Sequence, residues 1–265
     1  MMGSDNPNAP AGWKPSHTVN VSEFKLDKYE VTVGRFRRFV EAYPGSFPNE
    51  GDGAHPRIAN SGWVFGWGSY LPTSAAALAH ICDGSPTPSL CTWTDTPGAN
   101  ESKPMNGLSW YAAFAFCAWD GGRLATEAEW EYAAAGGDSQ SVFPWGNDNK
   151  TITCDRANIG TWDLQSCGGA PDAVGTRPLG QGRWHQLDLV GNVSEWTLDW
   201  YSADWYTTGG ASCTDCANLT SATYRTRRGG SFSVGFTQAP VYFRDLYEPT
   251  YPREYIGVRC ARDVP

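Results

Sequence analysis

The residue types best suited to chemistry lie in one short turn, Leu189-Val-Gly-Asn-Val-Ser-Glu-Trp196. A glycine turn with small neighbours leaves main-chain carbonyl oxygens free, and Glu195 adds a carboxylate. Oxygen ligands from a single tight turn are what calcium prefers. Asn192 and Glu195 would serve equally well to cap the turn. The pattern alone therefore leaves a calcium site and a purely structural turn open.

A second candidate is the stretch Arg227-Arg-Gly-Gly-Ser-Phe-Ser-Val-Gly-Phe236. Two adjacent glycines followed by Ser231 let the backbone approach another group closely. The next residues, Ser233, Val234 and Gly235, carry almost no chemistry. The stretch thus offers close backbone approach but few reactive side chains.

Motifs of several common enzyme classes are absent from the sequence, including HExxH, a GxSxG elbow, GxGxxG after a strand and a phosphate loop. Three of the histidines could meet in space to hold iron or zinc, but separate histidines are the commoner case, so we expect no such site. The histidines are at least 25 residues apart: His17, His55, His80 and His185.

Three glutamates lie in the first turns of a predicted helix, and the helix dipole accounts for them: Glu127, Glu129 and Glu131.

Charge and hydropathy exclude two classes of partner. The 265 residues contain 20 Lys and Arg against 28 Asp and Glu, a formal charge of -8. Basic residues are scattered apart from small groups at 35–38 and 225–228, whereas phosphate binding needs a concentrated basic face. No apolar run approaches the ~20 residues of a membrane span. We therefore expect neither a nucleic-acid partner nor a membrane span.

The eight cysteines indicate an oxidising compartment. Sequence alone does not fix their pairing, although three pairs are close in sequence and would staple loops. The CxxC at 213–216 would also suit a redox pair or half a zinc site, but no second CxxC exists and the neighbouring glycines indicate a loop. We expect an extracytoplasmic protein, secreted or periplasmic, whose leader is absent from this chain. The close pairs are Cys82/Cys91, Cys154/Cys167 and Cys213/Cys216, and Cys117 and Cys260 are left over.

Three segments have helical periodicity and caps. Elsewhere, short apolar pieces alternate with turn residues, and 13 Trp, 12 Tyr and 11 Phe supply the burial. These features predict one α+β domain over residues 1–265 with little regular structure, in which 73–100 is an inserted surface loop. The helices are a first capped by Thr32 and ending before Pro44, a second capped by Ser109 over Trp110 to Trp119, and a third opened by a Thr126/Glu129 capping box and running through Ala135.

Taken in order, the motifs resemble those of the formylglycine-generating-enzyme domain, also called the sulfatase-modifying-factor domain. The resemblance runs from Met2 almost to Pro265 and is specific as a set. It implies an elaborated C-type-lectin-like fold with short helices and small antiparallel sheets, and a disulfide between Cys117 and Cys260. The motifs are Met2-Gly-Ser4, Phe24-Lys-Leu-Asp-Lys-Tyr-Glu-Val-Thr32, Ser109-Trp-Tyr111, Gly122-Arg-Leu-Ala-Thr-Glu-Ala-Glu-Trp-Glu-Tyr-Ala133, Phe143-Pro-Trp-Gly146, Gly191-Asn-Val-Ser-Glu-Trp196, Arg228-Gly-Gly-Ser-Phe232 and Gly257-Val-Arg-Cys-Ala261.

The resemblance also implies calcium. Its second calcium site maps onto the carbonyl oxygens of Val190, Gly191 and Val193 and the carboxylate of Glu195. Its first site begins at a step matched by Asn158 and Ile159. The aspartate that should follow has no clear counterpart, because Cys167-Gly-Gly-Ala-Pro-Asp172 replaces that region. We expect Ca²⁺ at the Glu195 turn and a weaker second site at Asn158 and Ile159.

One departure from the family decides the functional expectation. Enzymes of the family oxidise a substrate cysteine to formylglycine with copper(I) and oxygen, and two cysteines after Gly-Gly-Ser bind the metal. The corresponding residues here are Val234 and Ala239, which offer no donor to a soft ion that needs thiolates. We therefore expect no copper and no formylglycine synthesis by that mechanism.

The leading hypothesis is a secreted, calcium-stabilised module that uses the family groove to bind a peptide, protein or glycan. The alternative is an oxidoreductase of the same superfamily with a non-cysteine metal centre. Trp196 and Ser231 match residues that flank the family's oxygen pocket, although we favour a structural role for both. The groove residues expected from the resemblance are Trp196, Ser231, Phe232, Tyr242 and Arg244.

Overall fold

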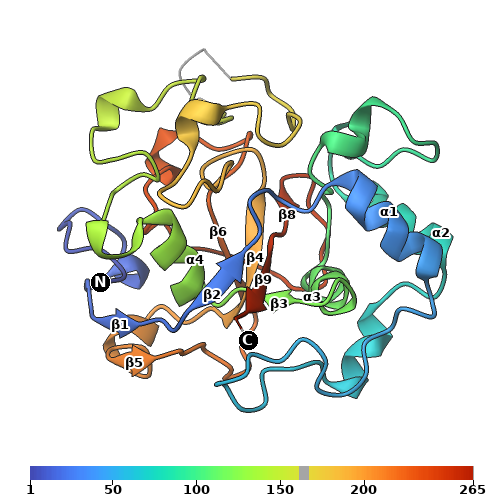
Figure 1. The fold of residues 1–265 in the computed structure, drawn as a ribbon, viewed down its shortest axis with the longest axis horizontal. Helices are drawn as coiled ribbons and strands as arrows, with labels where there is room; N and C mark the ends of the chain where they lie inside the picture. Colours follow the sequence, from blue (N-terminus) through green and yellow to red (C-terminus); the bar gives the residue numbers. More distant parts are fainter. Residues whose placement is uncertain (161–166, 265) are drawn as a thin grey trace.

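A computed structural model describes residues 1–160 and 167–264, and Figure 1 shows their arrangement. Regular structure is sparse, as the sequence predicts, and much of the chain runs as turns and single-turn 3-10 helices. Four α-helices are described: α1 (Val33–Ala42), α2 (Ala75–Ala79), α3 (Trp110–Trp119) and α4 (Glu127–Ala134). The longest 3-10 helix is η2 (Phe65–Tyr70), and η10 (Phe236–Gln238) lies in the glycine-rich C-terminal loop.

Side-chain caps fix where the three predicted helices begin. The hydroxyl of Thr32 accepts the N–H of Arg35 (3.2 Å), and Ser109 caps α3 through the N–H of Ala112 (3.2 Å). Thr126 and Glu129 form the complete capping box of α4. The predicted positions of these helices are confirmed within a residue or two.

The strands form three small sheets. A two-stranded sheet pairs β1 with β5, a three-stranded sheet has the order β2-β9-β3, and a four-stranded sheet has the order β7-β6-β4-β8. Their bounds are β1 (Val19–Asn20), β2 (Phe24–Leu26), β3 (Arg123–Leu124), β4 (Ser194–Trp200), β5 (Cys213–Thr214), β6 (Arg225–Arg228), β7 (Asp245–Tyr247), β8 (Ile256–Gly257) and β9 (Cys260–Asp263).

Most of the strand pairs are antiparallel, as expected, but two are parallel. The three-stranded sheet is antiparallel, and β6 pairs antiparallel with both β4 and β7. By contrast, β4 runs parallel to β8, with Ser194 opposite Ile256, and β1 runs parallel to β5. Long connections make this possible, because parallel neighbours need a crossover rather than a tight turn.

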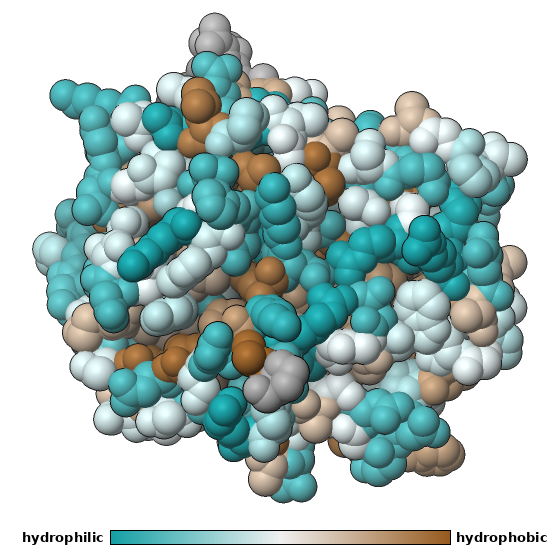
Figure 2. All heavy atoms as spheres, in the orientation of Figure 1, coloured by the Kyte–Doolittle hydropathy of each residue, from teal (hydrophilic) through white to brown (hydrophobic). Residues whose placement is uncertain are grey.

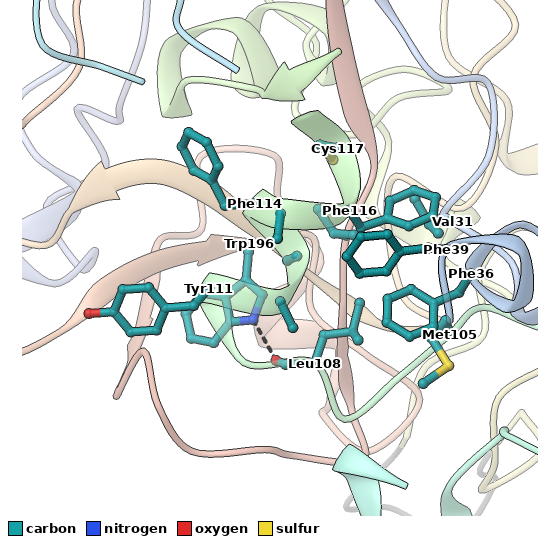
Figure 3. Packing of buried hydrophobic residues seen from close by; sticks show 14 of the residues in the cluster. Val31, Phe36, Phe39, Met105, Leu108, Tyr111, Phe114, Phe116, Cys117 and Trp196 are labelled. Carbon is teal, nitrogen blue, oxygen red and sulfur yellow. Dashed lines mark hydrogen bonds between the residues drawn. The ribbon is translucent and has the colours of Figure 1, made fainter. Parts of the chain in front are cut away.

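The main hydrophobic core lies between α1, α3 and the four-stranded sheet. In Figure 1, α1 and α3 lie on one side of the central strands and α4 on the other. Figure 3 shows the rings of Phe36 and Phe39 from α1 facing Phe116 from α3. The Phe36 and Phe116 rings stack at 5.5 Å, and Phe39 meets Phe116 edge-on at 5.7 Å. Helix α3 is buried over almost its whole length, which explains why its sequence is apolar all round.

All four expected disulfides are present. One of them, between α3 and β9, joins segments that are 143 residues apart, whereas the other three close loops of 13 residues or fewer. The pairs are Cys82–Cys91, Cys117–Cys260, Cys154–Cys167 and Cys213–Cys216.

Two of the close pairs do not lie wholly in loops, which corrects the expectation of simple loop staples. Cys91 directly follows the 3-10 helix η4 (Pro88–Leu90), and its partner Cys82 is buried within η3 (Ile81–Gly84). Cys213 pairs with Val19 in the β1–β5 sheet, and Cys216 follows β5 and is half-buried. Local turn residues suggested loops because they do not reveal that a distant strand such as β1 pairs with this segment.

The region 73–100 is more than a surface loop, which corrects the prediction. It contains α2, which packs against α1. Leu78 and Cys82 of this region are buried.

Among the described residues, no helix has both the length and the apolar character needed to cross a bilayer. The face in Figure 2 is mostly hydrophilic, with hydrophobic groups scattered among polar ones.

Candidate functional site

The two adjacent glycines of the C-terminal loop have left-handed backbones. Gly229 and Gly230 follow β6 with φ of +88° and +69°. A Cβ on Gly229 would lie 3.2 Å from the carbonyl oxygen of Leu189 and 3.2 Å from Cζ2 of Trp130. Glycine is needed here both for its backbone conformation and for the close approach to the 189–196 turn.

Hydrogen bonds join that turn to the glycine loop and to Asn158. The N–H of Gly191 donates to the carbonyl of Gly229 (2.8 Å), and the N–H of Phe232 donates to the carbonyl of Asn192 (2.9 Å). The N–H of Asn192 donates to the carbonyl of Asn158 (2.7 Å). Three segments that the sequence singled out separately are thus brought into one place.

The carboxylate of Glu195 is already engaged by protein donors. Nε of Arg259 lies 2.8 and 2.7 Å from its two oxygens, and the indole N–H of Trp130 donates to Oε2 (2.6 Å). In the described part of the chain, no hydrogen bond ends on the carbonyl oxygens of Gly191 or Val193, whereas the parallel bridge between Asn158 and Gly191 directs the N–H of Asn158 to the carbonyl of Val190. The turn therefore offers two free carbonyls to a calcium ion, those of Gly191 and Val193, whereas Glu195 would have to serve both the ion and Arg259.

At the weaker predicted site, the buried Oδ1 of Asn158 has no hydrogen-bond partner within residues 1–160 and 167–264. Its Nδ2 donates to the carbonyl of Ala170 (2.9 Å). The carbonyl of Ile159 accepts the N–H of Cys167 (3.2 Å). One unsatisfied oxygen is consistent with a cation at Asn158, while the carbonyl of Ile159 is occupied by the protein. Residues 161–166 lie outside the described part of the chain.

Negative charge gathers around this turn. Glu30 accepts the N–H of Val193 (3.0 Å) and Nδ2 of Asn192 (2.6 Å), and Asp188 accepts the N–H of Gly175 (2.6 Å). Burial raises the pKa of Glu30 well above its usual range, and repulsion from Asp188 and Glu195 adds to the effect. Burial likewise raises the pKa of Asp188. Arg259 attracts all three acids, and a divalent cation would further relieve their repulsion.

Val234 and Ala239, which the family resemblance aligns with the copper positions, offer no metal donor. Ala239 is 2% exposed and packs in an apolar cluster with Phe143, Ile159 and Val190. Val234 is partly buried. The described residues include all eight cysteines, and all are disulfide-bonded. The residues present therefore do not fit copper(I).

Most of the expected groove residues lie in the interior, which corrects the expectation that they line an open groove. Trp196 is part of the main core, and its indole N–H donates to the carbonyl of Leu108 (2.8 Å), as Figure 3 shows. Phe232 and Ser231 are also buried, and the hydroxyl of Ser231 lies 2.9 Å from that of Ser233. These contacts account for Trp196 and Ser231 by structure alone.

Arg244, another of the expected groove residues, is instead a buried ion-pair partner. Its Nε and Nη2 donate to the two oxygens of Glu127 (2.6 and 2.9 Å), and Nη1 donates to the carbonyl of Gly12 (2.8 Å). Tyr242 is only partly buried and does line a cavity.

The helix dipole alone does not account for the three glutamates of α4. Each is buried and bound to its own arginine: Glu127 to Arg244, Glu129 to Arg123 and Glu131 to Arg228. Burial opposes ionisation of Glu129, yet hydrogen bonds from His55 and Arg123 lower its pKa to about 2. The sequence did contain a signal for this burial, because α4 has no polar face around the three acids. Buried acids need cationic partners.

The histidines do not converge. Nε2 of His55 lies 3.4 Å from Glu129, the ring of His17 packs 4.3 Å from that of Tyr206, and His80 pairs with Asp83 at the surface. Within the described ranges, no group of three or more His, Cys, Asp or Glu side chains is placed to hold a metal ion.

A cavity of about 750 Å³ lies beside the loop that carries Val234 and Ala239. Two segments form it, one around 142–152 and the other at 236–242. Phe236, which is 42% exposed, Pro240 and Tyr242 form one wall, and Phe143, Asp148 and Lys150 contribute to the other. We call this the loop cavity. Its mixed apolar and charged lining is typical of a ligand site.

Residues 1–264 match the family model described as the sulfatase-modifying factor enzyme 1-like domain. This chain belongs to the sulfatase-modifying factor family. A formylglycine-generating enzyme of Thermomonospora curvata is 31% identical over 294 residues, covering 99% of this chain and 90% of that protein. An inactive C-alpha-formylglycine-generating enzyme 2 of Bos taurus is 32% identical over 266 residues, covering 89% and 83%.

Solved structures show the same fold. PvdO from Pseudomonas aeruginosa aligns with a TM-score of 0.66 at 21% identity, over 99% of this chain and 90% of that one. Treponema denticola variable protein 1 aligns with a TM-score of 0.65 at 20% identity, over 98% and 90%. These two structures therefore share the fold of this chain at low sequence identity. Within this fold, the chain combines the Glu195 turn with Val234 and Ala239, which carry no metal donor.

Proposed function

We propose that this chain is a calcium-stabilised, secreted binding module of the sulfatase-modifying factor family that does not make formylglycine with copper. Its ligand would be a peptide, protein or glycan held in the loop cavity.

The observation that carries the proposal is the environment of Ala239. At this position a copper(I) site needs a thiolate, but the methyl group packs instead against Phe143, Ile159 and Val190. No cysteine in the described part of the chain is free to replace it. The Bos taurus relative, whose name describes it as inactive, is a precedent for a non-catalytic member.

The loop cavity supports binding at the same location. Its volume is about 750 Å³, it lies next to the loop that carries Val234 and Ala239, and the exposed ring of Phe236 lines it. Exposed aromatic side chains are common anchors in recognition sites, and Asp148 and Lys150 add one charge of each sign to the opposite wall.

Calcium and secretion rest on separate features. Two free carbonyls, at Gly191 and Val193, and the nearby buried acids favour a divalent cation. Four disulfides favour an oxidising, extracytoplasmic location.

Copper loading tests the absence of the family chemistry. The wild type, the V234C/A239C double variant and the matched V234S/A239S control would be titrated anaerobically with copper(I) and, separately, with iron(II), then exposed to oxygen and a cysteine-containing peptide. We expect stoichiometric copper only in V234C/A239C. One equivalent of copper or iron(II) in the wild type with oxygen consumption would instead establish the alternative, a non-cysteine oxidoreductase.

Binding is tested on peptide and glycan arrays with the wild type and F236A. We expect discrete array signals that fall at least tenfold in F236A. Signals unchanged in F236A, or none at all, would contradict recognition through the loop cavity.

A further inference from the structure

Strand β2 is an outer strand of its sheet, and one of its edges is free. On the other edge it pairs with β9, where the N–H of Asp27 donates to the carbonyl of Cys260 (2.9 Å). Backbone groups alternate between the two edges of a strand, so Lys25 also faces β9, whereas Phe24 and Leu26 face away from it. Within residues 1–160 and 167–264, nothing bonds to the N–H and C=O groups of these two residues.

The protein itself occupies both ends of this free edge. At one end, the N–H of Ser22 donates to Oδ1 of Asp215 (2.7 Å). At the other end, the carbonyl of Lys28 accepts the N–H of Leu187 (2.9 Å). The unpaired stretch between them therefore has a defined length, and it offers room for one short strand.

A pocket of about 550 Å³ lies along the unpaired stretch, and we call it the β2 slot. Residues 21–26 form one side, and Tyr132, Ala133, Trp184 and Gln186 form the other. Figure 1 shows β2 between α4, which carries Tyr132, and β9. The ring of Trp184 is 42% exposed and stacks on that of Tyr132 at 5.4 Å. The unpaired backbone thus borders a pocket whose far wall is aromatic.

The side chains of β2 indicate what an added strand would carry. Phe24 and Leu26 are half-buried, and the ring of Phe24 lies 6.5 Å from that of Tyr132. Glu23 and Lys25 alternate with them and are exposed. Cross-strand neighbours share a face of the sheet, so apolar residues of the added strand would lie beside Phe24 and Leu26, and polar ones beside Glu23 and Lys25.

The β2 slot also contains an unsatisfied polar side chain. Gln186, next to the residue that closes one end, is 7% exposed, and its Oε1 has no hydrogen-bond partner in the described part of the chain. A buried acceptor without a donor is unfavourable. This end of the slot is therefore incomplete without a ligand.

We propose that the β2 slot binds an extended peptide segment of a partner protein, which joins the sheet as a new strand beside β2. Its backbone pairs with Phe24 and Leu26, and its apolar side chains pack on Tyr132 and Trp184. An extended peptide presents donors and acceptors in the alternation that a sheet edge requires. The inference goes beyond the proposed function, because the β2 slot shares no residue with the loop cavity.

The shape of the slot favours a single segment over two other occupants. A second copy of this chain would have to bring the edge of a folded sheet against β2, although both ends of the stretch are occupied and Trp184 stands beside it. A glycan would stack on Trp184, but it has no regular row of donors and acceptors to match the edge of a strand.

The first test is isothermal titration calorimetry with acetylated pentapeptide amides of the sequence Thr-Xaa-Thr-Xaa-Thr, in which Xaa is Val, Leu, Phe or Tyr. We expect saturable one-to-one binding of at least one peptide. Its matched controls are N-methylated at one or the other alternate set of backbone amides. The set that faces β2 should weaken binding at least tenfold when methylated, and the other set should leave it within twofold. No saturable binding of any peptide at millimolar concentration, or equal effects of the two sets, overturns the proposal.

Amide hydrogen exchange followed by NMR locates the new strand. Saturating peptide should slow exchange at Phe24 and Leu26 at least tenfold, and Lys25, which already faces β9, is the internal control. Exchange at Phe24 and Leu26 that is unchanged by peptide overturns the proposal. Slowing that depends on protein concentration without peptide would show that a second copy occupies the edge, which also overturns it.

Variants and a sugar probe separate the remaining alternatives. W184A, at an exposed position, should weaken peptide binding severalfold, whereas F236A, in the loop cavity, should leave it within twofold. The reverse pattern would place the peptide in the loop cavity and overturn the proposal. Saturable binding of maltotriose that is lost in W184A, without slower exchange at Phe24 and Leu26, would make the slot a sugar site and overturn it as well.

Discussion

Arg259 binds both carboxylate oxygens of Glu195 through Nε, at 2.8 and 2.7 Å, in the interior of the protein. Nη2 of the same guanidinium donates to the carbonyl of Leu187 (2.8 Å). The pair thus joins the segment after β8 to β4 and to the chain just before the Glu195 turn.

Breaking this pair should be strongly destabilising. We expect R259M to lower the free energy of unfolding by about 3–5 kcal/mol, because Glu195 would remain buried without its counter-ion. Urea unfolding followed by circular dichroism measures the loss. The matched control is R57M, since Arg57 is 52% exposed and lies 3.7 Å from Asp215, a pair expected to contribute at most ~1 kcal/mol. Equal effects of the two variants would contradict the assignment.

Removing calcium should lower the thermal stability. A ligand at 100 times its Kd contributes about 2.7 kcal/mol, which corresponds to roughly 5–10 °C in Tm for a chain of this size. Differential scanning calorimetry in excess calcium and in EGTA measures the shift. We expect E195Q to reduce it, because the ion would lose its carboxylate. A Tm that is the same in calcium and in EGTA would show that the turn is purely structural.

Asp199 should make the protein less stable as the pH rises toward neutrality. Burial, with repulsion from Glu127, raises its pKa to about 7 from 3.8. Because the folded state favours the protonated acid, its contribution is present below pH ~4 and is lost as the pH rises to about 7. The full effect is about 4 kcal/mol.

Urea unfolding of the wild type and D199N between pH 4 and 8 isolates this contribution. The unfolding free energy of the wild type minus that of D199N should fall as the pH rises from 4 to about 7, and it should then level off. A difference independent of pH would contradict the raised pKa.

Truncating the aromatic core between α1 and α3 should cost far more than truncating a surface ring. F116A removes the ring that contacts both Phe36 and Phe39. We expect a loss of about 3–5 kcal/mol from the lost burial and the cavity left behind. F65A removes a ring that is 85% exposed and should change stability by at most ~0.5 kcal/mol. Denaturant unfolding of both variants checks the contrast.

Local features were predictable from sequence, and long-range pairings largely were not. The caps of Thr32, Ser109 and Thr126 are fixed by neighbours three residues away, so the helices follow from the sequence directly. The pairs Arg228–Glu131 and Arg244–Glu127 span 97 and 117 residues, and no local pattern specifies which arginine meets which acid.

The disulfides also differ in how far their pairing could be predicted from the sequence. Cys82–Cys91 and Cys213–Cys216 join cysteines 9 and 3 residues apart, so their proximity is visible in the sequence. Cys117–Cys260 spans 143 residues and followed from family resemblance. Even for the short pairs, the sequence did not reveal that Cys213 lies in a strand, because its partner β1 is almost 200 residues away.

The candidate site was predictable only in part. The need for glycine at 229 and 230 was visible in the sequence, but their contact with the Glu195 turn depends on how β4 and β6 pair. The groove prediction for Phe232 and Arg244 was wrong because residue type alone does not say which side of a loop faces solvent.

The order β2-β9-β3 places the strand nearest the end of the described chain at the centre of its sheet. During synthesis, Phe24–Leu26 and Arg123–Leu124 leave the ribosome long before Cys260–Asp263, the strand that both must pair with. Loss of only these last residues would separate β2 from β3 and remove a cysteine from α3's disulfide. The sheet can close only after Asp263 has left the ribosome, so β2 and β3 must wait, unpaired with each other's partner strand, until almost all of residues 1–263 have been made.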